Sequence, residues 1–247
     1  MDRRYFHEGA AASIVVMRIR AGQASYVLHA GSFDPGRQAY RLGVTARSTV
    51  TPKERPHLVA AFTGGFALNS GSGGYVQERQ VVAPLKPGLA SLVIDAGGAA
   101  RVGVWMHDLP LPGERVFSVR QNLRPLVLDG RPSARAGDLL AWGATLGGGA
   151  AVARTALGED KAGNLLFAAA MAVTPAQLAD VLVRAGARTA MQLDINPEWV
   201  QFDYAHMPGG GLTAGIPGQH RPANQYLLGW TRDFVTVLAP AGAVTHK

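Results

Sequence analysis

Residues 164–199 read NLLFAAAMAVTPAQLADVLVRAGARTAMQLDINPEW, and they place two apolar runs on either side of a helical pattern. Thr174 can cap the helix, Pro175 suits its first position, and Gln177 completes a capping box. Apolar residues then recur at helical spacing, at Leu178, Val181, Leu182 and Ala185, before Gly186. The stretch therefore predicts a strand, a helix and a second strand in direct succession.

The rest of the chain contains short apolar runs of strand length, separated by glycine, proline and asparagine. The 247 residues include 31 glycines and 15 prolines, so turns are frequent. Strands are predicted at residues 13–20, 25–29, 57–62, 90–95, 101–105, 125–129, 151–156, 164–170, 189–193, 199–204 and 233–238, with a helical turn at 51–55. This pattern predicts an α+β fold with mixed or antiparallel β-sheets and few helices. No linker divides the chain, so we expect a single domain over residues 1–247.

The composition excludes several classes of protein. Hydrophobic residues make up 47% and charged residues 17%, which argues against intrinsic disorder. Cysteine is absent, which rules out disulfides and thiolate sites, and no apolar run is long enough to predict a membrane span. The first residues lack the pattern of a secretory signal. The formal net charge of +7 favours anionic partners, but aromatic residues are only 7%, so we expect no nucleic-acid partner.

Asp194 follows the second strand of the opening stretch, at a point where a carboxylate can emerge from the core into a cleft. Alternation directs Asp194 and Asn196 to the same side. Three interpretations remain open: an Asx-type turn that caps backbone amides, a catalytic carboxylate, and a metal site. The metal interpretation is disfavoured, because Trp199 occupies the position where a calcium-binding loop needs glycine. The motifs predict neither a metal site nor a cofactor.

Two further stretches carry candidate binding residues. Gly64 and Gly65 follow a strand, where their missing side chains let the backbone approach a ligand, although an ordinary glycine turn has the same pattern. Arg120, Gln121 and Asn122 bring a cation and two amides together ahead of the next predicted strand. Guanidinium groups pair with phosphates, and amides suit sugar hydroxyls, whereas the structural alternative is a solvated loop.

Arg154 stands within an otherwise apolar run. Such an arginine either pairs with an internal carboxylate or points into a site. Asp129 precedes Gly130 and is expected to form a turn. The seven histidines are scattered without the spacing of a zinc enzyme.

Eight segments occur in the order seen in the phosphodiester glycosidase family. They are AAFTGGF (60–66), VVAPLKPGLASLVID (81–95), VGVW (102–105), VRQNLRPLVLDG (119–130), RTALG (154–158), GNLLF (163–167), TPAQLADVLVRAGA (174–187) and AMQLDINPEWVQF (190–202). The resemblance covers residues 25–238 and is closest to the actinobacterial branch, which carries LDINP before its tryptophan. Two departures stand out: Thr63 replaces the usual asparagine, and Glu78 stands where glycine is usual.

The resemblance implies an enzyme that hydrolyses a sugar-1-phosphate diester at the anomeric carbon and releases free sugar and a phosphomonoester. Asp194 would be the general base or would stabilise an oxocarbenium ion, and Arg154 and Arg120 would clamp the phosphate. Further substrate contacts are expected from Thr63, Gly64, Gly65, Gln121, Asn122 and Asn196. The resemblance also implies exopolysaccharide or envelope glycan metabolism, and an extracellular or cell-envelope location.

Two alternatives to an enzyme remain. A non-catalytic phosphoglycan-binding or exopolysaccharide-assembly module would bind without turnover. A nucleic-acid binder would lose affinity steeply as salt rises.

Overall fold

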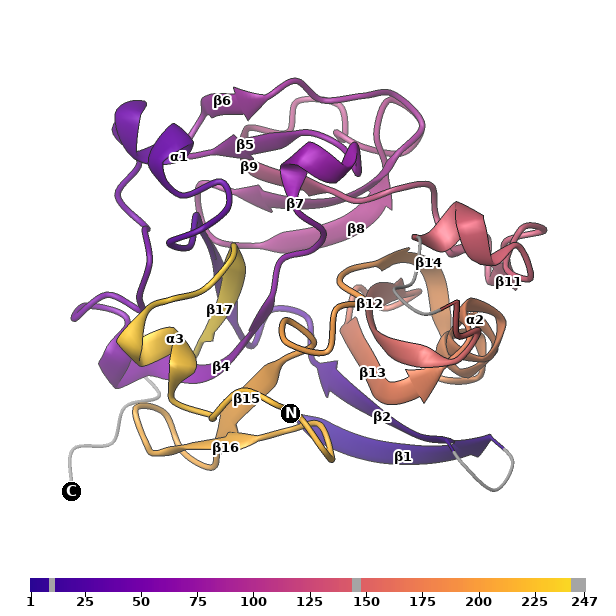
Figure 1. Ribbon diagram of the computed structural model, residues 1–247. Coiled ribbons are helices and arrows are strands. Elements are labelled where there is room, and N and C mark those ends of the chain that lie inside the picture. The colour runs from indigo at the N-terminus through magenta and orange to yellow at the C-terminus, as the bar shows by residue number, and fades with distance from the viewer. Residues whose placement is uncertain (9–11, 144–147, 241–247) are drawn as a thin grey trace.

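The computed structural model describes residues 1–8, 12–143 and 148–240 (Figure 1). The strands are β1 (Asp2–Glu8), β2 (Ala12–Ile19), β3 (Ser25–His29), β4 (Leu58–Thr63), β5 (Tyr75–Gln77), β6 (Gln80–Ala83), β7 (Ala90–Asp95), β8 (Ala100–Val104), β9 (Val116–Gln121), β10 (Val127–Leu128), β11 (Arg131–Pro132), β12 (Val152–Asp160), β13 (Leu165–Val173), β14 (Ala187–Gln192), β15 (Phe202–Ala205), β16 (Leu212–Ala214) and β17 (Phe234–Leu238). The α-helices are α1 (Arg37–Arg41), α2 (Pro175–Arg184) and α3 (Gln225–Leu228), and the 3₁₀ helices are η1 (Arg55–His57), η2 (Leu68–Ser70) and η3 (Leu139–Trp142).

The strands form three sheets. Their orders are β1-β2-β13-β12-β14-β10-β11, β16-β15-β4-β17-β3 and β6-β5-β9-β7-β8. Neighbouring strands within these sheets pair antiparallel throughout the described chain. Of the two expected sheet types, the structure therefore has antiparallel sheets, and the expectation of few helices is confirmed.

The strand–helix–strand unit forms as predicted. Thr174 caps α2 by accepting a hydrogen bond from the backbone N–H of Gln177, and the Gln177 side chain accepts one from the backbone N–H of Thr174. The strands on either side, β13 and β14, both pair antiparallel with β12, so they run parallel to each other with β12 between them. The end of β14 is fully buried at Met191 and Gln192, as is Leu193 directly after it.

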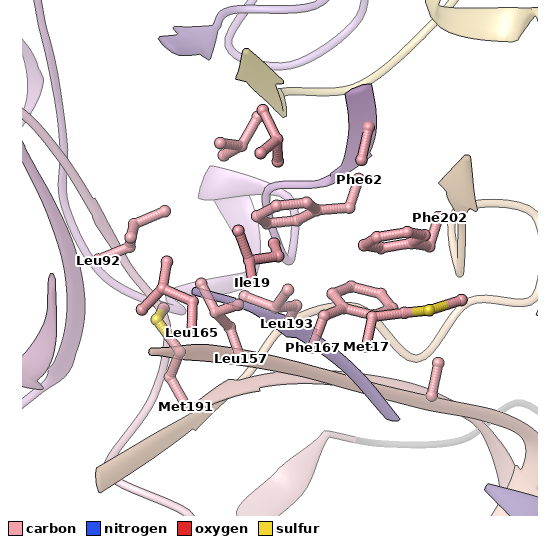
Figure 2. Packing of buried hydrophobic residues seen from close by; sticks show 14 of the residues in the cluster. Met17, Ile19, Phe62, Leu92, Leu157, Leu165, Phe167, Met191, Leu193 and Phe202 are labelled. Atoms are coloured by element: carbon pink, nitrogen blue, oxygen red, sulfur yellow. The ribbon is translucent and has the colours of Figure 1, made fainter. Parts of the chain in front are cut away.

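The β13 strand is buried on both faces, as its continuous apolar run predicts. Phe167 packs against Phe62 and Phe202 from the second sheet, with ring centroids 5.3 and 4.7 Å away (Figure 2). The opposite face of β13 presents Leu166 and Ala168 to the cluster that includes the buried side chains of α2. Burying a large apolar side chain contributes about 1.5–3 kcal/mol, so this sandwich fixes β13 and its neighbours firmly.

Some elements differ from those predicted. Arg120 and Gln121 end β9, a central strand between β5 and β7, where a loop was expected. The sequence did not predict this strand because Ser118, Arg120 and Gln121 are polar. In the structure these three side chains are buried. Residues 199–201 precede β15 instead of belonging to it. Within the described chain, no helix has the length and apolar character needed to cross a membrane.

Candidate functional site

Four chain segments meet where β14 ends. They are the turn after β14, the segment between β4 and η2, the end of β9, and the segment just before β17. The backbone of Asp194 is fixed first, because its N–H donates to Thr155 Oγ1 and its carbonyl accepts from Thr155 N, both at 3.0 Å. The antiparallel neighbour of β14 thus determines where the Asp194 side chain leaves the sheet.

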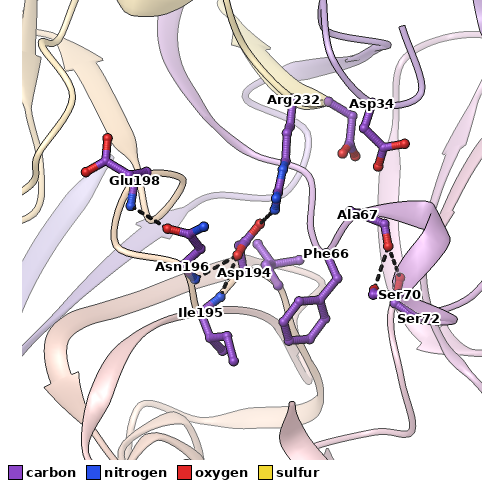
Figure 3. A network of polar contacts seen from close by, with 12 residues as sticks. Asp34, Phe66, Ala67, Ser70, Ser72, Asp194, Ile195, Asn196, Glu198 and Arg232 are labelled. Atoms are coloured by element: carbon purple, nitrogen blue, oxygen red, sulfur yellow. Dashed lines mark hydrogen bonds and ion pairs between the residues drawn. The ribbon is translucent and has the colours of Figure 1, made fainter. Parts of the chain in front are cut away.

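The Asp194 carboxylate is almost fully buried, with 1% of the residue exposed. Its Oδ1 accepts hydrogen bonds from the backbone N–H groups of Ile195 and Asn196, each at 2.8 Å (Figure 3). This is the Asx-type turn that the sequence allowed. Its Oδ2 accepts a hydrogen bond from Arg232 at 2.8 Å. The turn thus holds one oxygen and directs the other toward a cation.

Burial raises the pKa of Asp194, and the neighbouring Arg232 guanidinium and the two backbone N–H groups oppose that rise. A carboxylate with a raised pKa is a stronger base than a free one. Arg232 was not a sequence candidate. It lies one residue before Asp233 in a loop, and no local pattern indicates that its side chain reaches Asp194.

Arg120, near the end of β9, is completely buried. Its Nε donates to Asp233 Oδ2 at 2.7 Å and its Nη1 to the Gln121 carbonyl at 2.7 Å, while Nη2 contacts the Phe66 carbonyl. Burial raises the pKa of Asp233 to about 6 against the opposing charge of Arg120. The Arg120 guanidinium is therefore bonded to protein groups. Arg120 is not among the described residues that line the cavity next to Asp194, which is described below.

Gln121 and Asn122 are also fully buried and bonded to the backbone. Gln121 Oε1 accepts hydrogen bonds from the N–H groups of Gly74 and Lys86, at 3.0 and 2.8 Å. Asn122 Nδ2 donates to the carbonyl of Leu193, at 2.6 Å, directly before Asp194. The structure thus places these two amides as supports beneath the site, with Asn122 holding the end of β14.

Gly64 and Gly65 allow the backbone to approach the ion pair of Arg120 and Asp233 closely. A Cβ on Gly64 would lie 1.9 Å from Asp233 Oδ2, and one on Gly65 would lie 3.2 Å from Arg120 Nη2. Thr63, at the end of β4, is 2% exposed and pairs in register with Phe234. Space therefore requires glycine at position 64, and Thr63, Gly64 and Gly65 are not among the described residues that line the cavity near Asp194.

Arg154 lies on β12 and is fully buried. Its Nε donates to the Val173 carbonyl at 3.1 Å, and its Nη1 donates to Gln192 Oε1 at 2.9 Å and to the Trp142 carbonyl at 3.1 Å. Within the described residues no carboxylate pairs with it, and burial lowers its pKa to about 10. The adjacent residue Ala153 lines the pocket, but Arg154 does not. Its Nη2 is buried without a hydrogen-bond partner among the described residues, and a role of Arg154 in a phosphate clamp stays a prediction.

A cavity of about 840 Å³ opens above Asp194. Its described lining residues are Phe66, Ala67, Ser70, Leu123, Gly143, Val152, Ala153, Met171, Asp194, Ile195, Asn196, Pro197, Gly218, His220 and Arg232. Mostly apolar walls with a few polar groups are typical of a small-molecule site, and the volume lies in the usual range for one. Of the two candidates on the LDINP turn, Asp194 and Asn196 both reach this cavity, as alternation predicted.

His220 is a second residue that the sequence did not indicate. It lines the cavity, and its Nδ1 lies 2.8 Å from Glu198 Oε1. The Glu198 backbone N–H in turn donates to Asn196 Oδ1 at 3.0 Å. Arg232 and His220 are the basic side chains among the described lining residues. Those residues include no group of three or more histidine, aspartate and glutamate side chains placed to hold a metal ion.

Glu78 lies away from the cavity, in the turn between β5 and β6. Its backbone φ of 52° belongs to the left-handed region that glycine favours, which explains the glycine usual at this position. The Glu78 carboxylate accepts hydrogen bonds from the N–H groups of Thr45 and Ala46, at 2.7 and 2.8 Å. The glutamate that replaces the usual glycine therefore holds the loop that contains Thr45 and Ala46.

The sequence profile of phosphodiester glycosidases matches residues 56–194, more than half of the chain and the part that ends at Asp194. The chain belongs to the phosphodiester glycosidase family. The family resemblance seen in the sequence is thereby confirmed. A comparison with curated protein sequences found no significant match.

Among solved structures, the chain is similar to the zebrafish N-acetylglucosamine-1-phosphodiester α-N-acetylglucosaminidase catalytic domain, described as auto-inhibited by its pro-peptide. The TM-score is 0.59 at 17% identity, covering 97% of this chain and 82% of that one. A hypothetical protein from Synechocystis is also similar, with a TM-score of 0.52 at 11% identity, covering 96% of this chain and 61% of that one. At these identities the likenesses show a shared fold.

Proposed function

We propose that this protein hydrolyses a sugar-1-phosphate diester at the anomeric carbon and releases free sugar and a phosphomonoester. The observation that carries the proposal is the pair of Asp194 and Arg232, 2.8 Å apart and facing the cavity, in a member of the phosphodiester glycosidase family. The resemblance to bacterial relatives suggests exopolysaccharide or envelope glycan metabolism as the setting, at the cell envelope or outside the cell.

The chemistry divides between the two residues. A water oxygen forms a bond to the anomeric carbon while the bond from that carbon to the phosphate oxygen breaks. The water proton passes to Asp194, whose pKa is raised by burial. The leaving phosphate keeps the bonding electron pair, and because a phosphomonoester is a weak base it needs little protonation.

Arg232 takes the role for which Arg120 and Arg154 were the sequence candidates. Its guanidinium donates to Asp194 and also faces the cavity, where charge-assisted hydrogen bonds to phosphate are strong. His220 supplies a second group for phosphate or sugar oxygens. Asn196 faces the same space, whereas Arg120, Gln121 and Asn122 hold the surrounding backbone.

The decisive experiment measures release of sugar and phosphomonoester from α-N-acetylglucosamine-1-phosphate methyl diester and from the corresponding glucose, galactose and mannose diesters. The wild type is compared with Asp194→Asn, and Asp129→Asn serves as the matched control. Asp129 lies in an exposed turn with a φ of 52°, which asparagine tolerates.

Turnover in the wild type and the control, with a loss of at least about 100-fold in Asp194→Asn, would support the proposal. Full activity in folded Asp194→Asn would overturn the role of Asp194. Saturable binding of all four diesters without turnover would instead support the phosphoglycan-binding module, for which Thr63 in place of asparagine is the motivating observation.

A further inference from the structure

Three aromatic side chains form a continuous surface next to the cavity, which we call the aromatic rim: Trp199, Phe33 and Trp230. The ring centroids of Phe33 lie 5.9 Å from those of both Trp199 and Trp230, at interplanar angles of 61° and 57°. Phe33 is 53% exposed and Trp230 is 69% exposed. None of the three is among the residues lining the cavity, so the rim lies beside it.

The rim is built on two loops that are fastened to each other. The backbone N–H groups of Ser32 and Phe33 both donate to the Thr231 carbonyl, at 2.7 and 3.0 Å. The Trp230 N–H donates to Ser32 Oγ at 3.1 Å. The contact is close enough that a Cβ on Gly31 would lie 2.2 Å from the Arg232 carbonyl carbon. The rings are therefore presented by a rigid backbone.

Packing in the folded protein does not account for the backbone conformation of Trp230. Its φ of 63° places a bulky side chain in the left-handed region, which such residues rarely adopt. Its ring is more exposed than buried, so packing returns little for that backbone conformation. A strained, exposed tryptophan is the combination expected where a side chain is held out for a ligand.

Positive charge lies at the boundary between rim and cavity. The Arg232 guanidinium carbon is 5.0 Å from the Trp199 ring centroid, and that of Arg221 is 4.4 Å from it. Arg232 also donates to Asp194, so a phosphate on Arg232 would have the cavity on one side and Trp199 on the other. The sugar that loses its phosphate bond fits the cavity beside Asp194, which leaves the rim for the group beyond the phosphate.

We propose that the aromatic rim is a subsite for a glycan chain on the leaving-group side of the phosphate. Pyranose rings present flat C–H faces that pack on aromatic rings, and the three rings follow one another at centroid separations of 5.9 Å, which offers more than one stacking position. The flanking guanidiniums favour a polar, phosphorylated glycan over a lipid tail. The inference rests on the proposed function, and it specifies which residues contact the leaving group.

The test compares two α-N-acetylglucosamine-1-phosphate diesters, one with a methyl leaving group and one whose phosphate is esterified to a disaccharide. Trp230→Ala and Phe33→Ala are measured on both. Tyr5→Ala is the control, because it removes an exposed aromatic ring on β1, which belongs to a different sheet from β3 and β17. We expect kcat/KM on the disaccharide diester to fall about 10-fold in each rim variant, chiefly through KM. The methyl diester should lose much less, and Tyr5→Ala should match the wild type.

Equal losses on both diesters would overturn the subsite, because they would show a structural effect. A third diester, with a long-chain alkyl leaving group, is measured on the wild type. A higher kcat/KM on this alkyl diester than on the disaccharide diester would also overturn the subsite. If the wild type turns over none of these compounds, the proposed function fails by itself. Calorimetric binding of the disaccharide diester then still decides the rim: weaker binding in Trp230→Ala supports it, and unchanged binding overturns it.

Discussion

The Arg232–Asp194 pair permits a quantitative prediction, because Arg232 is the charged side chain whose hydrogen bond reaches the Asp194 carboxylate. We consider Arg232→Met, which removes the charge and keeps most of the apolar stem. An opposite charge in direct contact lowers the pKa of a carboxyl by about 1–3 pH units. Removing it should therefore raise the already elevated pKa of Asp194 by that amount.

The effect on stability follows from linkage. The folded-state pKa of Asp194 lies above its unfolded value, so its contribution to stability is fully present below the unfolded pKa and decreases as pH rises through the folded pKa. In Arg232→Met the decrease continues to higher pH. At 1.36 kcal/mol per pKa unit, the pH-dependent destabilisation relative to wild type should reach about 1.4–4 kcal/mol above the new pKa. It should become smaller as the pH falls toward the unfolded-state pKa, because the carboxyl is then increasingly protonated in both proteins.

Urea unfolding of both proteins at intervals from pH 4 to pH 8 measures this difference without any substrate. Where a diester is turned over, the acid limb of the kcat/KM profile should move up by the same 1–3 units in Arg232→Met. Arg232→Lys, which keeps a charge, should restore much of the shift, and Arg188→Met, at an exposed pair, should show none. A destabilisation that is equal at pH 4 and pH 8 would refute the electrostatic coupling.

Three further predictions concern the groups around the site. Gly64→Ala should lose about 2–3 kcal/mol in urea unfolding, because its Cβ would overlap Asp233 Oδ2, while Gly137→Ala, with open space around it, should stay within about 0.5 kcal/mol; equal values would contradict the packing argument. Arg120→Met should cost about 3–5 kcal/mol by leaving the buried Asp233 carboxylate unpaired, and a loss below about 1 kcal/mol would argue against a stabilising pair. Burial raises the pKa of Asp203 to about 8, so stability should decline as pH rises from about 4 to 8, by at most about 1.4 kcal/mol per pH unit from this one group. Asp203→Asn should flatten that slope, and unchanged pH dependence would show that Asp203 ionises normally.

The sequence was sufficient for the elements whose signals are local. The α2 helix follows from its capping box and apolar spacing, and β13 follows from an apolar run buried on both faces. The end of β14 therefore fell where expected, and Asp194 and Asn196 reached the cavity together. The β9 strand was missed because Arg120 and Gln121 look like solvated residues, and only the three-dimensional structure supplies the buried partners that satisfy them.

The guanidinium at the site shows why the remaining residues could not be predicted. Arg154 stands out in the sequence because it interrupts an apolar run, and Arg120 because two amides follow it. In the structure both arginines lie on strands and are fully buried. Asp233 and the backbone bond the donors of Arg120. For Arg154, Gln192 and two carbonyls bond Nε and Nη1, whereas Nη2 is buried without a hydrogen-bond partner among the described residues. An arginine that meets a substrate must instead keep part of its surface open, as Arg232 does with 22% of its side chain exposed. Such a residue lies in a polar loop with no periodic context, and its distance of 38 positions from Asp194 is closed by the pairing of β17 with β4. The sequence signals that single out an arginine here therefore select arginines on buried strands, and Arg232 at the cavity is found only from the fold.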